Sequence, residues 1–351
     1  MADARRVRAE ILYDGKEVGL SARVEKVSYT DNDYGRADEI SLTFSDRDRD
    51  WLMQKFIPEK EHNLDASLWF HRWHGIGVEK YHCGNFTIDD ITYSGTPSEC
   101  VIKGVSVPAS SDFQVVPKSK TWEKVTIKQI AEEKMKDYGM TSLFYNMPDP
   151  DQIYEKIEQD NESDSEFLFR LCEERGFFIK VYKAGLVIFD KNIYEPRGPK
   201  AIFNINDLEN FRWNTTLTET YTGAVLEYTN PATKDANGKT IRKKKNMPDM
   251  PKTLSIAVGE GPRLLYLSQS ADDEAEARRI AAAAVNEANE KAVTVSFRCM
   301  ANVNLYATDN FELTGMGRMN GKYYTQSVTH SVGQSGESMT VTGYKIFERM
   351  R

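Results

Sequence analysis

The sequence predicts a mainly β protein with an α+β middle part, in which two β-barrel-like domains are joined by a small α+β domain. Short segments with alternating apolar and polar residues fill roughly the first 110 residues and return after residue 205, a pattern typical of barrels or sandwiches. Between them the apolar spacing becomes helical. We therefore expect domains at residues 1–118, 119–204 and 205–351.

The first β region contains strand and turn signals. Ile40–Phe44 alternates apolar and polar side chains, as a half-buried strand does. Asp14-Gly15 separates Ile11–Tyr13 from Glu17–Leu20 and predicts a tight hairpin. At Asp89-Asp90 the apolar alternation shifts by one residue, which predicts a β-bulge.

The middle region has two helix starts. Thr126 with Gln129 and Ser163 with Glu166 form capping boxes, which satisfy the amide groups at a helix N-terminus. A glycine follows the last turn of each predicted helix. Residues 177–189 then predict a strand pair, which completes a small α+β domain without a visible active site.

The last region predicts strands around one long helix, Asp272–Ala292. Acidic residues stand at its N-terminal end, where the helix dipole favours them. Its apolar stripe consists mostly of small residues, which allow close packing on a sheet: Ala277, Ile280, Ala281, Ala284 and Ala288. Two β regions around a spacer are compatible with a duplicated barrel, although no residue-level repeat links them.

The composition is that of a globular protein. Of 351 residues, 40% are hydrophobic and 28% charged, which argues against disorder and against a membrane protein. The net charge of −7 argues against a general nucleic-acid-binding surface. We find no secretory signal and no membrane-spanning run, so we expect folding in the cytoplasm without membrane insertion. The four cysteines lack CxxC spacing and are expected to be reduced: Cys83, Cys100, Cys172 and Cys299.

One group of residues has metal-ligand types. His71 and His74 stand three apart, with His82-Cys83 further on. On a strand, the spacing of three sends the two imidazoles to opposite faces. We therefore expect no metal site here and predict a surface or partly buried strand.

Candidate catalytic residues are also weak. Asp89-Asp90 and Glu173-Glu174 are adjacent in sequence, which does not place two carboxyls across a substrate. His330 has no recognisable partner, and Gly315-Met316-Gly317 lacks the third glycine of a nucleotide-binding loop. We assign no catalytic, cofactor-binding or metal-binding residue and expect no enzyme activity.

A basic run, Arg242-Lys243-Lys244-Lys245, stands in the polar stretch Thr229–Lys252. Such a run is usually a solvated loop. Contact with an acidic neighbour or with nucleic acid stays open and would depend steeply on salt.

Five segments resemble, in the same order, those of the phage late control D family of tail hub proteins and the hub part of type VI secretion valine-glycine repeat spike proteins. The most specific runs from Glu162 to Asp190, with a Glu-Ser-Asp helix start, Phe-Leu-x-Arg-Leu and Glu-Arg-Gly before the strand pair. The others are Arg36–Asp46, Gly84–Ile91, Lys120–Ile127 and Gly321–Ser331. The resemblance covers about residues 11–343, and in it Gly315–Gly317 is the turn before the closing strands.

The resemblance implies a structural baseplate hub with tail-hub architecture. Family members form a homotrimeric ring whose six barrels adapt the six-fold tail tube to the three-fold spike. Expected partners are other copies of the chain, tail tube proteins, a separate spike protein, other baseplate proteins and, as a further candidate, the tape measure protein. The expected location is a virion or phage-tail-like particle, assembled in the bacterial cytoplasm.

Two other classes stay open. A tail enzyme that degrades peptidoglycan would lyse cell-wall material in a zymogram. A carbohydrate- or receptor-binding module would be a stable monomer with affinity for glycans. The sequence does not distinguish a phage from a bacteriocin particle or another injection system.

Overall fold

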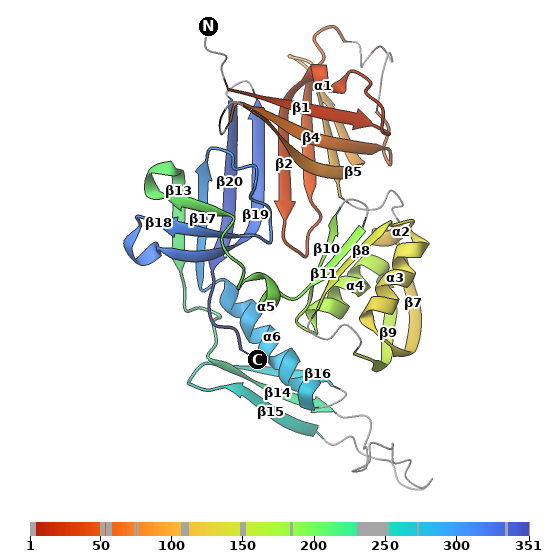
Figure 1. Ribbon diagram of the computed structural model, residues 1–351. Helices are drawn as coiled ribbons and strands as arrows, with labels where there is room; N and C mark the ends of the chain where they lie inside the picture. Colours follow the sequence, from red (N-terminus) through yellow and green to blue (C-terminus); the bar gives the residue numbers. More distant parts are fainter. Residues whose placement is uncertain are drawn as a thin grey trace.

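The computed structural model describes residues 5–49, 53, 58–73, 75, 77–106, 112–147, 152–182, 185–229, 253–271, 274–333 and 336–350. Figure 1 shows two β domains in its upper half, the middle domain beside them, and a smaller sheet with a long helix below. The mainly β fold with an α+β middle part is confirmed. No helix in these ranges is long and apolar enough to span a membrane.

The first β domain is a run of six strands in the order β1-β4-β5-β6-β3-β2. Its elements are β1 (Arg6–Tyr13), α1 (Leu20–Arg23), β2 (Val24–Asn32), β3 (Glu39–Ser45), β4 (Asn63–His71), β5 (Val78–Ser94) and β6 (Glu99–Val105). Strand β3 buries every second residue, as its alternation predicts. The bulge at Asp89-Asp90 is confirmed, since the β5–β6 register shifts between Ile88 and Asp90.

At Asp14-Gly15 the predicted turn forms, but the predicted second strand of the hairpin is wrong. Both turn residues have positive φ, and Tyr13 bridges Lys16. The chain then forms α1 instead of a returning strand, because β1 pairs along its whole length with β4 from elsewhere in the chain. Leu20, predicted to end the strand, is buried in α1.

The second β domain repeats the strand order of the first. Its order is β12-β18-β19-β20-β17-β13, the same as in the first domain when strands are matched in chain order. Its elements are β12 (Ala201–Asn204), η1 (Ile205–Asp207), β13 (Leu208–Thr215), β17 (Val293–Cys299), β18 (Asn310–Thr314), η2 (Gly317–Met319), β19 (Gly321–Gly333) and β20 (Gly336–Lys345). One difference is that β12 pairs with β18 in parallel, whereas β1 pairs with β4 antiparallel.

The repeat extends to single residues. The sequence analysis, which found no residue-level repeat between the two β regions, is corrected on this point. Matching Gly84 with Gly321 places the β5–β6 bulge, between Ile88 and Asp90, on the β19–β20 bulge, between Thr325 and Ser327. The partner strands match as well: Gly104 lies opposite Ile88 and Gly343 opposite Thr325. The two domains are therefore copies of one six-strand unit.

The two copies are joined edge to edge. Strand β2 pairs antiparallel with the C-terminal half of β19, from Val27 opposite Val332 to Asn32 opposite Ser327. This pairing makes one continuous twelve-stranded sheet, and both domains contribute to one hydrophobic core.

The middle domain has its own core. Both predicted capping boxes are present, at Thr126 and at Ser163. The predicted strand pair of residues 177–189 is confirmed as β10 and β11, which extend a small sheet with β8. Its elements are α2 (Asp112–Val115), β7 (Pro117–Val125), α3 (Ile127–Asp137), β8 (Ser142–Asn146), β9 (Tyr154–Ser163), α4 (Asp164–Glu173), β10 (Phe178–Tyr182), β11 (Gly185–Phe189) and α5 (Lys191–Tyr194).

A separate layer is inserted between β13 and β17. It contains β14 (Gly223–Thr229), β15 (Thr253–Gly259), β16 (Leu264–Ser270) and α6 (Glu274–Glu290). Helix α6 confirms the long helix and packs on this sheet. Its buried stripe is shifted from the predicted one, since Ala282 and Val285 are buried while Ala284 and Ala288 are only partly buried.

Candidate functional site: a charged junction between the domains

Buried charged side chains from four parts of the chain meet where the middle domain contacts the β domains. We call this group the charged junction; its members are Asp31, Asp33, Asp38, Lys180, Lys191, Glu195, Glu290 and Arg349. All are nearly inaccessible to solvent. Burying a charge is costly unless it is paired, so the positions of these groups are closely tied to one another.

Lys180 extends from β10 of the middle domain to the first β domain. Its Nζ donates to the carboxylate of Asp31 and to the carbonyl of Asn32, and lies 3.0 Å from Asp38 Oδ1. The second Asp31 oxygen accepts a 2.8 Å hydrogen bond from the backbone N–H of Ala307, in the second β domain. Asp31 therefore links three parts of the molecule.

The pKa values of Lys180 and Asp38 are set by burial and by their charged neighbours. Burial lowers the pKa of Lys180, but Asp31 and Asp38 outweigh burial and raise it above its ordinary value. Burial raises the pKa of Asp38 to about 7, against the opposing attraction of Lys180.

Lys191, the first residue of α5, is fully buried. Its Nζ lies 2.8 Å from both carboxylate oxygens of Glu290 in α6 and 3.6 Å from Oδ2 of Asp33, the residue after β2. The ammonium also lies 4.1 Å from the ring centroid of Tyr34, a cation–π distance. Burial raises the pKa of Asp33 to about 7.

Arg349 ties the segment after β20 into the junction. Its Nη2 donates to Glu195 Oε1 and to Glu290 Oε1, each at 2.7 Å. The hydroxyl of Tyr344 donates to the same Glu195 oxygen at 2.6 Å. The basic groups of the junction thus face carboxylates, an arrangement that holds these parts of the chain together.

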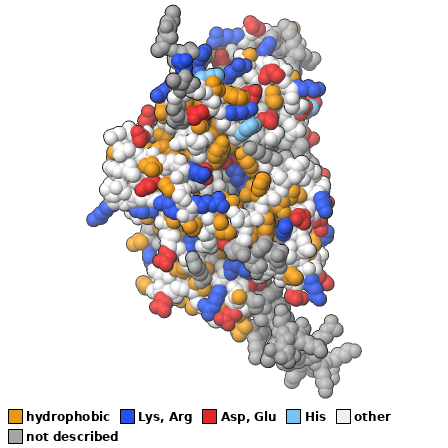
Figure 2. All heavy atoms as spheres, in the orientation of Figure 1, with side chains coloured by type: hydrophobic (Ala, Val, Ile, Leu, Met, Phe, Trp, Pro, Cys, Tyr) orange, Lys and Arg blue, Asp and Glu red, His pale blue; other side chains and the backbone are white. Residues whose placement is uncertain are grey.

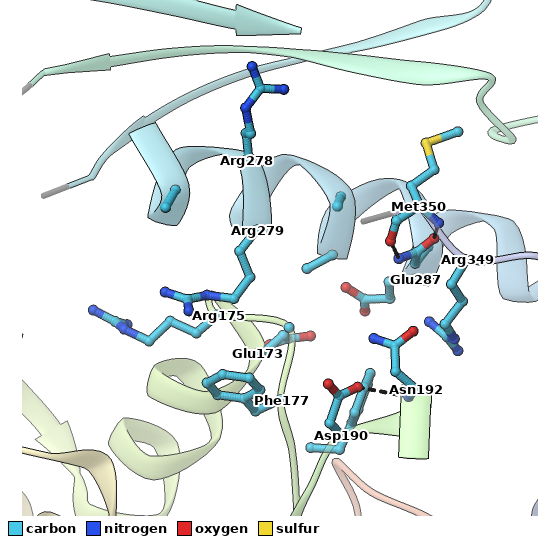
Figure 3. A pocket seen from close by; sticks show the side chains of 16 residues that line it. Glu173, Arg175, Phe177, Asp190, Asn192, Arg278, Arg279, Glu287, Arg349 and Met350 are labelled. Atoms are coloured by element: carbon cyan, nitrogen blue, oxygen red, sulfur yellow. Dashed lines mark hydrogen bonds between the residues drawn. The ribbon is translucent and has the colours of Figure 1, made fainter. Parts of the chain in front are cut away.

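A cavity of about 250 Å³ lies beside the junction, between α6, the end of α4 and the segment at Arg349. In Figure 3, Arg278 points away from the other labelled side chains, while Asp190 and Asn192 lie across from α6. Glu173 and Glu287 both line this cavity. The Asp190 carboxylate accepts the N–H of Asn192 at 2.8 Å and caps α5, so it has a structural role.

The structure describes three members of the histidine group, His71, His82 and Cys83. His71 ends β4, and His82 lies on β5 with its Nδ1 3.3 Å from Ser67 Oγ. Cys83, the next residue, is buried, while His82 is exposed. His74 lies outside the described residues. Within the described ranges no three metal-ligating side chains form a cluster.

One member of each acidic pair forms an ion pair with a basic residue. Asp90 forms a 3.1 Å ion pair with Lys103 on the neighbouring strand β6. Glu174 pairs with Arg170 at 3.2 Å, one helical turn away. Glu173 lines the cavity beside the junction.

His330 does have a partner, which corrects the sequence analysis. Its Nδ1 lies 3.1 Å from Glu337 Oε1, and both side chains are completely buried. The pair is a cross-strand contact between β19 and β20.

Gly315-Met316-Gly317 forms the turn between β18 and β19. The basic run Arg242–Lys245 lies outside the described residues. Figure 2 shows acidic and basic side chains mixed over the visible face, with hydrophobic side chains near its centre.

The sequence analysis missed the charged junction. One signal was present: Lys180 is the charged residue within the apolar run Phe177–Tyr182, where a strand buries its side chains. A lysine there needs a buried carboxylate partner. Which carboxylate it meets depends on contacts between distant parts of the chain, 149 residues apart for Asp31.

The duplicated β domains around an α+β middle domain form a fold that solved tail proteins share. The fold is similar to a solved tail protein from Neisseria meningitidis MC58, with a TM-score of 0.70, 9% identity, and 97% of each chain covered. It is also similar to an E. coli component of the type VI secretion system, with a TM-score of 0.57, 11% identity, and coverage of 99% of this chain and 78% of that one. These likenesses show the fold.

The chain belongs to the phage tail baseplate hub (GPD) family, whose model matches residues 105–336. It is 26% identical over 273 residues to a probable baseplate hub protein of Escherichia phage 186. This match covers 74% of this chain and 64% of the relative. The match therefore spans less than two thirds of that relative's length. The family predicted from the Glu162–Asp190 segment and its companions is confirmed.

Proposed function

We propose that the chain is a structural, non-enzymatic baseplate hub of a phage or phage-tail-like particle, assembled in the bacterial cytoplasm. Family membership carries the proposal. Two copies of a six-strand unit in one chain support it, because three such chains offer six similar β domains to a six-fold tube and three equivalent positions to a spike.

In this proposal residues 1–118 and 205–351 form the ring and residues 119–204 act as a spacer. The charged junction suits the task, since it ties the spacer to both β domains through buried ion pairs. Partners in the particle are tail tube proteins, a spike protein, other baseplate proteins and the tape measure protein.

Multi-angle light scattering tests the ring. We expect the purified chain to have three times the chain mass of 40.0 kDa, and a complex with tube or spike protein to have that mass plus the mass of the bound partner. A monomer under all these conditions contradicts the trimeric hub. Peptidoglycan zymography tests the non-enzymatic role, and lysis by the isolated chain contradicts it.

A further inference from the structure

Lys180 is a buried amine that faces two carboxyl groups. Its Nζ donates to Oδ1 of Asp31 and lies 3.0 Å from Oδ1 of Asp38. All three side chains are buried. In Figure 1, strand β10, which carries Lys180, lies next to the end of β2, which carries Asp31. A nucleophilic nitrogen and a carboxyl group are therefore held together at a site that bulk water hardly reaches.

The other oxygen of Asp31 is held by a backbone donor. Oδ2 accepts a 2.8 Å hydrogen bond from the N–H of Ala307 in the second β domain. When an amine adds to a carboxyl carbon, negative charge develops on this oxygen, and a fixed N–H stabilises that charge. The Asp31 carboxyl thus has a nucleophile at one oxygen and a charge-stabilising donor at the other.

Asp38 can carry the protons that such a reaction must move. Its Oδ1 accepts the backbone N–H of Asn32 at 2.9 Å and lies beside the same Nζ. Its Oδ2 is buried and has no hydrogen-bond partner among the described residues. Burial raises the pKa of Asp38 to about 7, so near neutral pH this carboxyl can both hold and release a proton.

Two further lysines are buried in the described part of the chain, and their carboxylates differ from Asp31. Lys134 pairs with Asp164, whose other partners among the described residues are hydrogen-bond donors, so the site offers no second carboxyl. Lys191 has a second carboxyl nearby, but Arg349 donates to its partner Glu290 at 2.7 Å. A guanidinium stays charged at any ordinary pH and keeps this carboxylate an anion, which is a poor electrophile.

We propose that Lys180 and Asp31 form an isopeptide bond within the chain, with Asp38 as the acid–base group. The Lys180 ammonium first passes a proton to Oδ1 of the Asp31 carboxylate that it contacts. The freed Nζ then bonds to Cγ of Asp31, and the electron pair of the C=O bond moves onto Oδ2, to which Ala307 donates. Asp38 takes a proton from the nitrogen and returns one to Oδ1. As the C=O bond re-forms, the Cγ–Oδ1 bond breaks and Oδ1 leaves as water. An ammonium and a carboxylate thus become one amide and one water, and no other reagent is consumed.

The surroundings favour this bond. Holding two reacting groups in a productive geometry is equivalent to an effective concentration of about 10⁵–10⁸ M. The neutral amide also replaces two buried charges, whose burial is costly. A cavity of about 210 Å³, lined in part by Tyr182 and Tyr306, adjoins the site and can take up the released water. The two carboxylates raise the pKa of Lys180, so its amine is rarely neutral and we expect the reaction to follow folding slowly.

The bond would join the first β domain to the middle domain covalently. Asp31 and Lys180 are 149 residues apart, so the amide closes a long loop of the chain. A cross-link over a long loop restricts the unfolded chain strongly. Unlike the ion pair, the amide persists when acid protonates a carboxylate or when the chain is denatured.

Intact mass spectrometry of the denatured full chain tests the bond. After incubation of the folded protein at neutral pH, we expect a mass lower than that of the sequence by one water. Lys180→Arg, which keeps the positive charge, gives the reference and should lose no water. A chain that keeps the full sequence mass after prolonged incubation overturns the proposal, and this measurement needs no variant to fold.

Peptide mapping locates the lost water. Trypsin does not cut after an acylated lysine, so we expect residues 27–36 and 176–183 to appear as one branched peptide. The Asp14-Gly15 sequence can also lose water, by closing to a succinimide. Loss of water without the branched peptide overturns the proposal.

Two variants test the role of the second carboxyl. Asp38→Asn keeps the shape of the side chain and removes the proton carrier, so it should slow the loss of water at least tenfold. Lys103→Arg, in the exposed ion pair with Asp90, is the matched control and should lose water at the unchanged rate. An Asp38→Asn variant that is folded by circular dichroism and loses water at the unchanged rate overturns the proposed reaction.

Discussion

Replacing Asp164 with asparagine would remove the charge at the centre of the middle domain while keeping the shape of the side chain. Asp164 is the first residue of α4 and is fully buried. Its carboxylate pairs with Lys134, whose side chain is 3% exposed. It also accepts hydrogen bonds from Lys118 at 2.8 Å, Tyr138 at 2.6 Å and Gln159 at 2.8 Å.

The expected cost comes mainly from Lys134. Removing one partner of a buried pair costs about 3–5 kcal/mol, because the other charge stays buried without compensation. Lys118 is 40% exposed and can turn to water, so its share is at most about 1 kcal/mol. We therefore expect Asp164→Asn to lower the free energy of unfolding of the middle domain by about 3–5 kcal/mol.

Urea unfolding followed by hydrogen exchange of α4 peptides measures this change. Asp160→Asn, at an exposed position of β9, is the matched control and should change stability by less than about 0.5 kcal/mol. A loss below about 1 kcal/mol in Asp164→Asn would refute the reasoning that Lys134 depends on this carboxylate.

The acid dependence gives an independent check. Burial alone would raise the pKa of Asp164, but hydrogen bonds from Lys118 and Lys134 outweigh it and hold the pKa well below its usual value. The stability from this group is present above the unfolded pKa of about 3.9 and is lost as pH falls through the folded pKa. Asp164→Asn should lack this acid-side loss, and an unchanged acid profile would contradict the assignment.

Two further predictions use the same unfolding assay. An added Cβ at Gly343 would lie 2.2 Å from the Tyr324 carbonyl oxygen, whereas at the equivalent Gly104 the nearest atom would be 3.0 Å away. Gly343→Ala should therefore lower the free energy of unfolding by about 3 kcal/mol or more, and Gly104→Ala by about 1 kcal/mol. Equal losses in the two variants would contradict this packing. The pKa of Asp33, raised to about 7, means that stability is highest with the group protonated and falls as pH rises from about 4 through about 7. Asp33→Asn should reduce the slope of that fall by up to about 1.4 kcal/mol per pH unit. The control Asp48→Asn, at an exposed position, should leave the slope unchanged. A pH profile of Asp33→Asn identical to that of the unchanged protein would refute the burial argument.

Local features of this fold could be predicted from the sequence. The capping boxes at Thr126 and Ser163 depend on residues three apart, and both form as expected. The strand alternation of Ile40–Phe44 also needs only one buried face. Such signals are contained within a few residues, so tertiary contacts did not overrule them.

Pairing between distant segments could not be predicted in this way. The Asp14-Gly15 turn forms, but β4 took the place of the expected returning strand. The repeat of the β domains was hidden because buried positions require only apolar residues of fitting size, such as Leu42 in β3 and Phe297 in β17. The glycines at Gly104 and Gly343 are shared because the neighbouring strand leaves little room for a side chain.

Lys191 shows what the duplication does for the whole molecule. In the first β domain residues 33–38 connect β2 to β3, and Asp33 from this connection faces Lys191. In the second, the equivalent connection from β13 to β17 contains α6, whose Glu290 pairs with the same lysine. One buried cation is thus held by an acid from each copy of the repeat. Moving α5 relative to either β domain would separate buried charges, which costs several kcal/mol, so the middle domain keeps both β domains in fixed orientation.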